Sequence, residues 1–341
     1  MTVVHAHTRG FVETQAEWFA PGAPAAFPAK TPQLAIVVPC FNETAVLPET
    51  TRRLVTVLEG LIAGGRAAPE SQVVYVDDGS RDGSWEMIES IAHACERVGG
   101  IKLSRNRGHQ NALLAGLFTV DADAVISVDA DLQDDVEAMS EMLQSYQQGV
   151  HVVYGVRNDR RSDGLFKRAS AQAFYRVLKA LGVESIYNHA DYRLMSRPAI
   201  VALRNFGEVN LFLRGIVPLL GFKSSVVHYA RAERFAGVSK YPLRKMLALA
   251  LDGVTSFSVV PLRLITSIGF LVFLGSCGMG LWTLWVRLFT THAVPGWTST
   301  LLPIYFLGGI QILCVGIIGE YLGKVYQEAK GRPRYIIEKL I

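Results

Sequence analysis

The chain has 341 residues, of which 50% are hydrophobic, and its formal net charge is +4. So small a charge does not favour a nucleic-acid-binding protein, and a mean hydropathy of +0.25 is high for a soluble enzyme. The length allows about two domains, and the excess of apolar residues must lie in a membrane-embedded part or in a large core.

Residues 1–33 carry no periodic pattern and contain several prolines, which predicts a tail or linker. From Leu34 onward, short apolar runs alternate with segments of helical spacing. The strands predicted from the apolar runs are Leu34–Val38, Val73–Val76, Ile101–Leu103, Ala124–Val128, Val152–Tyr154 and, in a less regular part, Ser224–Ala232. The predicted helices are Val46–Ile62, Trp85–Ala94 and Val136–Tyr146. This alternation is typical of an α/β domain with a doubly wound, largely parallel sheet.

Polar clusters directly follow several of the predicted strands. They are Pro39–Glu43, Asp77–Ser80, Asp129–Asp131 and Gly155–Arg157. Because ligands bind beyond the carboxyl ends of parallel strands, these clusters predict one shared site. A carboxylate in Asp77–Ser80 can accept hydrogen bonds from a base or a ribose, and the Asp-Gly pair also favours a turn, which is compatible with that role.

Asp129, Asp131 and Gln133 alternate along the chain, so an extended strand end would direct their side chains the same way. Carboxylate and amide oxygens suit Mg²⁺ or Mn²⁺, which proteins hold together with substrate phosphates. A calcium loop of the EF-hand type would need glycine and glutamate where this chain has Asp134 and Ser140. A helix N-cap role remains open for Asp134 and for the residue after it, Asp135.

Two stretches near the C-terminus, Leu264–Val286 and Leu301–Gly319, contain no charged residue and are each long enough to cross a bilayer. They predict two transmembrane helices, with a buried hairpin in a soluble core as the alternative. Lysine and arginine residues precede the first stretch and follow the second, whereas the loop Leu288–Thr300 has neither. The positive-inside rule therefore places both ends in the cytoplasm, with Arg287 as the exception.

The segment Tyr241–Val260 has apolar residues at helical spacing and is predicted to lie in the membrane interface, with a helix on the domain surface as the alternative. The predicted division of the chain is a tail (1–33), an α/β domain (34–240), a juxtamembrane helix (241–260), a two-helix membrane domain (261–322) and a C-terminal tail (323–341).

Several motifs, taken in order, resemble one enzyme family. They are VPCFNE (Val38–Glu43), VDDGS (Val76–Ser80), NRG (Asn106–Gly108), DADLQD (Asp129–Asp134), DYRLMSR (Asp191–Arg197), Arg234 with SKY (Ser239–Tyr241), and GEYLG (Gly319–Gly323) with RPRY (Arg332–Tyr335). The set is similar to the family 2 glycosyltransferases that load a sugar onto a polyprenyl phosphate, in particular to bactoprenol glucosyltransferases. Dolichyl-phosphate mannosyltransferases and the aminoarabinose transferases of lipid A modification are relatives. The resemblance runs from Leu34 to Ile337 and implies a GT-A type domain followed by two membrane helices.

The resemblance also implies residue roles. Asp129 and Asp131, the catalytic pair, would hold Mg²⁺ or Mn²⁺ and the donor diphosphate, together with Gln133. Lys167 and Arg168 would bind the acceptor phosphate, with a solvated basic face as the alternative. The residues implied to bind the donor are Pro39, Phe41, Glu43, Val76, Asp78, Ala130, Arg157, Arg234 and Lys240.

The chain departs from the family pattern at two places, and both bear on the donor sugar. Phe41 stands where many relatives have tyrosine, and His109-Gln110-Asn111 follows the Asn-Arg-Gly turn where the glucosyl branch often differs. No role is assigned to the histidines His109, His189 and His228.

The expected reaction is the inverting, metal-dependent transfer of a hexose, glucose from UDP-glucose, to undecaprenyl phosphate at the cytoplasmic face of a bacterial inner membrane. The expected partners are the nucleotide sugar, the lipid, the membrane and further copies of the chain, as in a homo-tetramer, but no nucleic acid. GDP-mannose, a UDP-N-acetylhexosamine and a UDP-aminoarabinose derivative are the alternative donors. A processive polysaccharide synthase would carry a Q-x-x-R-W motif, and the chain has no Arg-Trp pair. A non-catalytic scaffold or flippase partner is the remaining alternative.

Overall fold

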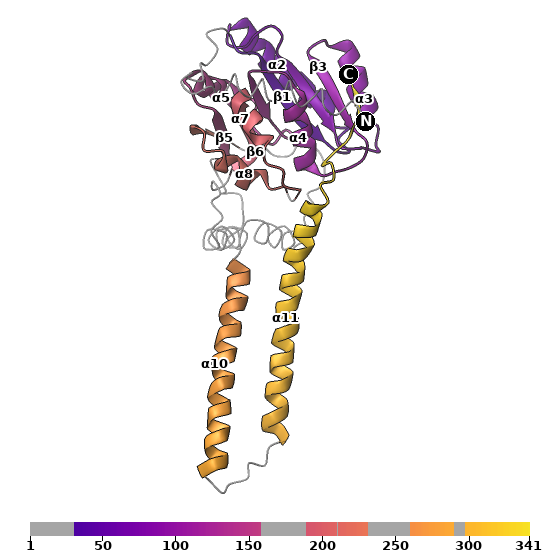
Figure 1. Ribbon diagram of the computed structural model, residues 1–341. Coiled ribbons are helices and arrows are strands. Elements are labelled where there is room, and N and C mark those ends of the chain that lie inside the picture. Colours follow the sequence, from indigo (N-terminus) through magenta and orange to yellow (C-terminus); the bar gives the residue numbers. More distant parts are fainter. Residues whose placement is uncertain (1–30, 158–188, 210, 231–259, 290–296) are drawn as a thin grey trace, which may run out of the picture. The chain divides into compact units, whose positions relative to one another are not determined.

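The computed structural model describes residues 31–157, 189–209, 211–230, 260–289 and 297–341 (Figure 1). The chain divides into two compact units. The first contains the sheet and the helices around it, and the second contains two long helices near the C-terminus. The predicted juxtamembrane helix, Tyr241–Val260, lies almost wholly outside the described residues.

Within the described residues, the first unit contains one eight-stranded sheet in the order β7-β5-β6-β4-β1-β2-β3-β8. Its strands are β1 (Leu34–Cys40), β2 (Gln72–Asp77), β3 (Val98–Leu103), β4 (Ala124–Ser127), β5 (Val152–Arg157), β6 (His189–Ser196), β7 (Ser224–Tyr229) and β8 (Ile337–Leu340). The pairs β1–β2, β1–β4, β2–β3 and β5–β7 are parallel, whereas β6 is antiparallel to both of its neighbours and β8 is antiparallel to β3. The prediction of a mostly parallel α/β sheet is therefore confirmed, with two antiparallel strands that the sequence pattern did not reveal.

Helices cover both faces of the sheet. The helices are α2 (Leu47–Ala63), α3 (Ser84–Ala94), α4 (His109–Thr119), α5 (Ala138–Gln147), α7 (Arg197–Leu203) and α8 (Leu213–Leu219). Alternate residues of a strand point to opposite faces, and Ile36 and Val38 of β1 pack with α2, α3 and α5 in one core. Val37 points the other way, and a Cβ on Gly116 of α4 would lie only 2.3 Å from it. Helix α4 therefore lies against the second face, and the glycine allows its close approach.

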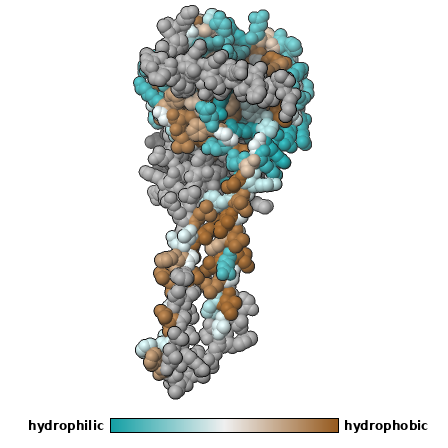
Figure 2. Space-filling view, in the orientation of Figure 1, coloured by the Kyte–Doolittle hydropathy of each residue, from teal (hydrophilic) through white to brown (hydrophobic). Residues whose placement is uncertain are grey.

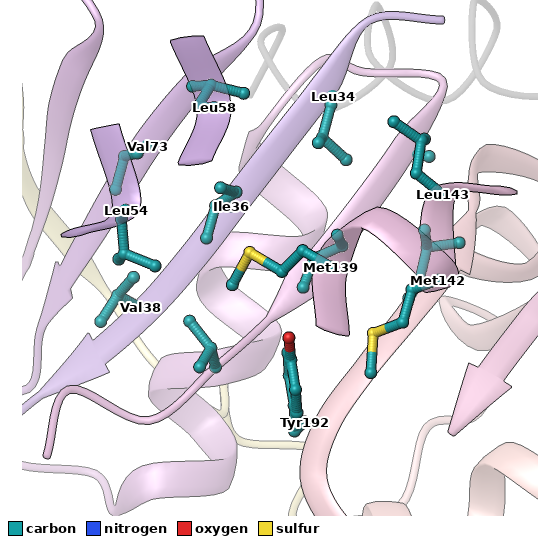
Figure 3. Packing of buried hydrophobic residues seen from close by; sticks show 14 of the residues in the cluster. Leu34, Ile36, Val38, Leu54, Leu58, Val73, Met139, Met142, Leu143 and Tyr192 are labelled. Atoms are coloured by element: carbon teal, nitrogen blue, oxygen red, sulfur yellow. The ribbon is translucent and has the colours of Figure 1, made fainter. Parts of the chain in front are cut away.

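Helix α2 illustrates how the sequence builds this layer. Pro48 occupies its first turn, where its missing N–H costs nothing, and Gly64 ends it. Leu47, Leu54 and Leu58 recur at helical spacing and are fully buried in the same core as Ile36 and Val38 of β1. Figure 3 shows Leu54 and Leu58 in this core. Each such leucine contributes about 2 kcal/mol of burial free energy. This packing fixes the helix that follows the first polar cluster of the candidate site.

Strand β4 has only four residues, and all four are buried. It lies between β1, which is parallel to it, and β6, which is antiparallel. The hydroxyl of Ser127 donates to the carbonyl oxygen of Asp191 on β6 at 2.6 Å. The loop that leaves β4 therefore starts from an anchored point in the middle of the sheet.

The second unit contains helices α10 (Val260–Phe289) and α11 (Trp297–Ala329). Large apolar side chains on both helices are exposed, among them Leu271 and Ile312, and Figure 2 shows this apolar surface along the helices. Among the described residues, one helical stretch, Phe306–Ala329, is long and apolar enough to cross a membrane by length and composition. The two predicted spans are therefore supported for one helix only.

The end of the chain forms a strand instead of a tail. Residues 333–341 belong to the first unit, and Ile337–Leu340 pair with β3 as strand β8. This strand is short, and most of its residues are exposed. Its sequence carries too little apolar alternation to predict a strand.

Candidate active site

The turn after β1 is shaped by side-chain contacts to the turn after β2. Asn42 has a left-handed backbone with φ of 57°. Its N–H donates to Ser80 Oγ at 2.9 Å, and its side-chain oxygen accepts from the N–H of Arg81 at 2.9 Å. Next to it, the ring of Phe41 is 42% exposed, so an apolar face stands open at the end of β1. Such a face can stack on a nucleobase.

Asp78 follows β2 and is held by backbone donors. Its carboxylate accepts from the N–H groups of Arg107 at 2.7 Å and Gly108 at 2.9 Å. Burial raises the pKa of this carboxyl, and the two backbone donors offset part of that effect. Gly79 next to it has φ of +70°, and a Cβ there would lie 2.6 Å from the backbone nitrogen of Asn106. The turns after β2 and β3 therefore lock together, backbone against backbone.

The loop after β4 is a turn and not an extended continuation of the strand. Asp129, Asp131 and Gln133 were expected on an extended strand end, but β4 ends at Ser127 and the chain then turns. Asp131 Oδ1 accepts from the N–H of Gln133 at 3.2 Å, and Leu132 has a left-handed φ of 57°. These features make a tight turn, because Asp side chains readily bond to the backbone two residues ahead.

Helix α2 holds this loop from the other side. Thr50 donates its hydroxyl hydrogen bond to the carbonyl oxygen of Ala130 at 2.8 Å, and it lies within the buried core. The loop is thus tied to β4 at its start and to α2 in its middle. The two aspartates on either side of Ala130 therefore occupy defined positions beyond the carboxyl end of β4.

Asp129 lies in a group of acidic side chains. Burial raises the pKa of its carboxyl to about 6, with further contributions from Asp134, Asp191 and Asp131, while His109 acts in the opposite direction. His109 begins helix α4, and its Nε2 lies 3.4 Å from Asp129 Oδ1 and 3.8 Å from Asp191 Oδ2. No role for this histidine is predicted from the sequence, although its place directly after the Asn-Arg-Gly turn is a usable signal.

Asp191 on β6 is the second carboxylate beside His109. It pairs with Arg193 Nη2 at 2.6 Å and with Arg214 Nη2 at 3.3 Å. Burial alone would raise its pKa, but Arg214, Arg193 and His109 together hold the pKa well below its usual range. Asp191 therefore stays ionised and is balanced by two guanidinium groups, whereas Asp129 faces one histidine.

Asp134 is not a helix cap. Helix α5 begins at Ala138 without a side-chain cap, and Asp134 is instead buried, accepting from Arg157 Nη2 at 2.9 Å and from the hydroxyl of Tyr229. Among the residues that the structure describes, its second oxygen, Oδ2, has no hydrogen-bond partner. Arg157, which the resemblance placed near the phosphates, thus forms an internal ion pair. Asp135 bonds the N–H of Glu137 at 3.0 Å, a turn ahead of the helix.

The residues present fit a divalent cation. Burial raises the pKa of Asp129, and the neighbouring charges of Asp134, Asp191 and Asp131 raise it further, so a bound cation would favour the ionised carboxylate. No group of three His, Cys, Asp or Glu side chains suited to a metal occurs in the part of the chain that the structure describes. Two carboxylates completed by an amide and ligand phosphates satisfy Mg²⁺ or Mn²⁺ without a third such residue.

The predicted donor and acceptor residues lie partly inside and partly outside the described residues. Pro39 and Val76 lie on β1 and β2, next to the turns that carry Phe41, Glu43 and Asp78, so these residues gather at adjacent strand ends. The cationic residues predicted to bind phosphates, Lys167, Arg168, Arg234 and Lys240, lie outside the described residues.

Family comparisons agree with this architecture. The model of glycosyl transferase family 2 matches residues 35–203, and that of the GtrB C-terminal hairpin matches residues 260–325. The uncharacterized glycosyltransferase YkoT of Bacillus subtilis is 48% identical, with 90% of this chain and 91% of that protein covered. The SfII prophage-derived bactoprenol glucosyl transferase of Shigella flexneri is 38% identical over 90% of this chain and 98% of its own length. The prophage bactoprenol glucosyl transferase homolog of Escherichia coli is 38% identical over 90% of this chain and 99% of that protein.

Proposed function

Since the chain belongs to the family 2 glycosyltransferases and is an enzyme of that class, we propose that it transfers a hexose from a nucleotide sugar to a polyprenyl phosphate. The proposed donor is UDP-glucose and the proposed acceptor is undecaprenyl phosphate, at the cytoplasmic face of the membrane. Two relatives that are 38% identical over nearly their whole length bear the name bactoprenol glucosyl transferase. Their similarity to this chain supports undecaprenyl phosphate as the acceptor and glucose as the transferred sugar.

The observation that carries the proposal is the gathering of Phe41, Asp78 and the Asp129–Asp131 loop at the carboxyl ends of β1, β2 and β4, which are adjacent strands. The exposed ring of Phe41 would stack on the base, and the carboxylate of Asp78 would accept from the base or ribose. Asp129 and Asp131, with Gln133, would hold Mg²⁺ or Mn²⁺. The ion would stabilise the negative charge that develops on the leaving diphosphate.

The chemistry is a single displacement. A phosphate oxygen of the lipid attacks the anomeric carbon of the sugar, the bond between that carbon and the diphosphate breaks, and the configuration inverts. A lipid monophosphate has a second pKa of about 6 and is largely dianionic at neutral pH, so it needs no general base. The demand on the protein is instead to hold two anions together, which Lys167, Arg168, Arg234 and Lys240 would meet with their positive charge.

The membrane part completes the proposal. Both α10 and α11 would cross the bilayer, with the catalytic domain and both chain ends in the cytoplasm, as the distribution of basic residues predicts. The uncharged stretch Leu264–Val286 within α10 supports the first crossing, and the match to the GtrB C-terminal hairpin supports a paired arrangement. Gly319 and Gly323 of α11 are four residues apart, as in closely packed helices, and this spacing supports a homo-oligomer.

The decisive experiment supplies the purified full chain, in lipid nanodiscs, with undecaprenyl phosphate, Mn²⁺ and a panel of nucleotide sugars. We expect consumption of UDP-glucose and formation of a glucosyl lipid from which mild acid releases glucose. Consumption of GDP-mannose, a UDP-N-acetylhexosamine or a UDP-aminoarabinose derivative instead would replace the donor and keep the reaction. No transfer from any donor, with intact nucleotide binding, would favour a scaffold role. Full activity in EDTA after removal of bound metal would exclude the metal site.

A further inference from the structure

Strand β8 is joined to β3 by a set of specific contacts. The N–H of Gly100 donates to the carbonyl oxygen of Ile341 at 3.1 Å, and the N–H of Ile341 donates back to Gly100 at 3.0 Å. Farther along, the N–H of Ser104 donates to the carbonyl oxygen of Ile336 at 3.0 Å. The pairing therefore extends through β3 to the first residue of the loop that follows it.

The strand β3 is shaped to receive this partner. A Cβ on Gly100 would lie 3.1 Å from the side chain of Ile341 and 2.8 Å from Ile88 of α3, so only glycine leaves room for both. Two ion pairs add to the contact: Lys102 on β3 binds Glu338 at 3.3 Å, and Lys339 binds Glu89 on α3. At the second glycine, Gly99, an added Cβ would lie 3.1 Å from the carbonyl oxygen of Ile341. The fit involves backbone, side chains and charge together.

The loop after β3 is the part that carries consequences for the site. Its residues Arg107 and Gly108 supply both backbone donors to Asp78, and the loop packs against Gly79. The next residue is His109, which reaches Asp129. In addition to the direct pairing of β3 with β2, residues 104–109 therefore connect β3 to Asp78 and Asp129, and the first residue of this loop is held by β8.

We propose that strand β8 is a positioning element of the donor site: its pairing with β3 sets the loop 104–108 and thereby the geometry of Asp78 and His109. The proposal rests on the proposed function, because that function identifies these residues as a nucleotide-sugar donor site. It assigns to the segment after helix α11 a part in nucleotide binding.

A matched pair of variants tests this in the full chain. Gly100 and Ile341 exchange both hydrogen bonds, so the pair two residues along, Lys102 and Lys339, is also of the bonded kind. Lys339→Pro removes an N–H that faces β3, and Lys339→Ala loses only the ion pair to Glu89. Two measurements are made in nanodiscs: hydrogen exchange of peptides covering residues 104–111, and binding of UDP with Mn²⁺ by calorimetry.

In Lys339→Pro, we expect exchange in residues 104–111 to rise at least fivefold and UDP to bind at least fivefold more weakly. Lys339→Ala should differ from the unaltered chain by less than twofold in both measurements. Faster exchange confined to β3 and β8, with residues 104–111 still protected, would overturn the proposal. So would loss of protection in β1 and β4, because β8 would then be needed for the whole fold. Failure of the unaltered chain to bind UDP, with the expected exchange result, would count against the proposed donor and leave the role of β8 standing.

Discussion

His109 Nε2 lies 3.4 Å from Asp129 Oδ1, so the first residue of α4 reaches a carboxylate in the loop that follows β4. The same ring nitrogen lies 3.8 Å from Asp191, which two arginines already balance. His109 is thus placed to orient Asp129 from one side while the turn after β4 fixes it from the other. Residues that contact metal-ligating carboxylates commonly tune metal affinity without touching the ion.

Replacing His109 by alanine should raise the Mn²⁺ concentration needed for half-maximal transfer by about tenfold, because Asp129 loses its orienting partner. Mn²⁺ binding followed by electron paramagnetic resonance should weaken in parallel. His228 is exposed on β7 and provides the control, since its alanine variant should leave both values unchanged. Equal metal affinity in the His109 variant and the unaltered chain would remove His109 from this role.

Asp134→Asn should lower the free energy of unfolding by about 3 kcal/mol, because it removes the buried charge that accepts hydrogen bonds from Arg157 and Tyr229. The side chain of Asp134 is 1% exposed, whereas that of Asp121, which pairs with Arg197, is 96% exposed. Asp121→Asn should therefore cost less than about 1 kcal/mol. Denaturant titration of both variants in detergent measures the difference, and equal costs would contradict it.

Gly79→Ala should disrupt the donor site as well as the fold. Its φ of +70° is unfavourable for alanine, and the added methyl group would meet the backbone of residues 105 and 106, which cannot turn aside as a flexible side chain can. Gly65 has φ of +65° with nothing within 4 Å, so Gly65→Ala isolates the cost of the backbone conformation. We expect Gly79→Ala to be less stable than this control by about 2 kcal/mol. Its affinity for UDP should fall, while that of Gly65→Ala should not.

The raised pKa of Asp129 predicts how stability depends on pH in the metal-free protein. The folded-state pKa is about 6, against about 3.9 for an unfolded aspartate. Between these values the folded state binds more protons, so this residue makes stability fall as the pH rises from about 4 to about 6. Asp129→Asn carries no charge at any pH. Its melting temperature should therefore exceed that of the unaltered chain above pH 6, and the difference should vanish near pH 4.

The central strands and the helices of one face could be predicted from the sequence because their patterns are strong. Leu34 begins both the predicted strand and β1, and the predicted helix Val46–Ile62 is matched by α2, Leu47–Ala63. Helix α4 was missed, since most of its residues are buried and no polar stripe marks a helical period. Strand β6 was missed because it carries Asp191 and Arg193, charges that its interior partners balance only in the folded chain.

Within the site, the residue types were predictable and the contacts were not. The carboxylates at the ends of β2 and β4 follow apolar runs, which is a local signal. The partners of these carboxylates, Arg107 and Gly108 for Asp78 and His109 for Asp129, come from another turn of the chain. The turn at Leu132 was also hidden, because alternation of polar residues is equally compatible with a strand and with a tight turn.

The pairing of β3 with β8 also sets an order of events during synthesis. Lys102 and Glu338 are 236 residues apart, so at a ribosome speed of 5–20 residues per second β3 waits about ten to fifty seconds for its partner. Helices α10 and α11 are made in that interval. During it, the nascent domain presents a bare strand edge on which other chains could align. Gly99 and Gly100, which are poor strand formers, lie on that edge and lessen its tendency to recruit the wrong partner.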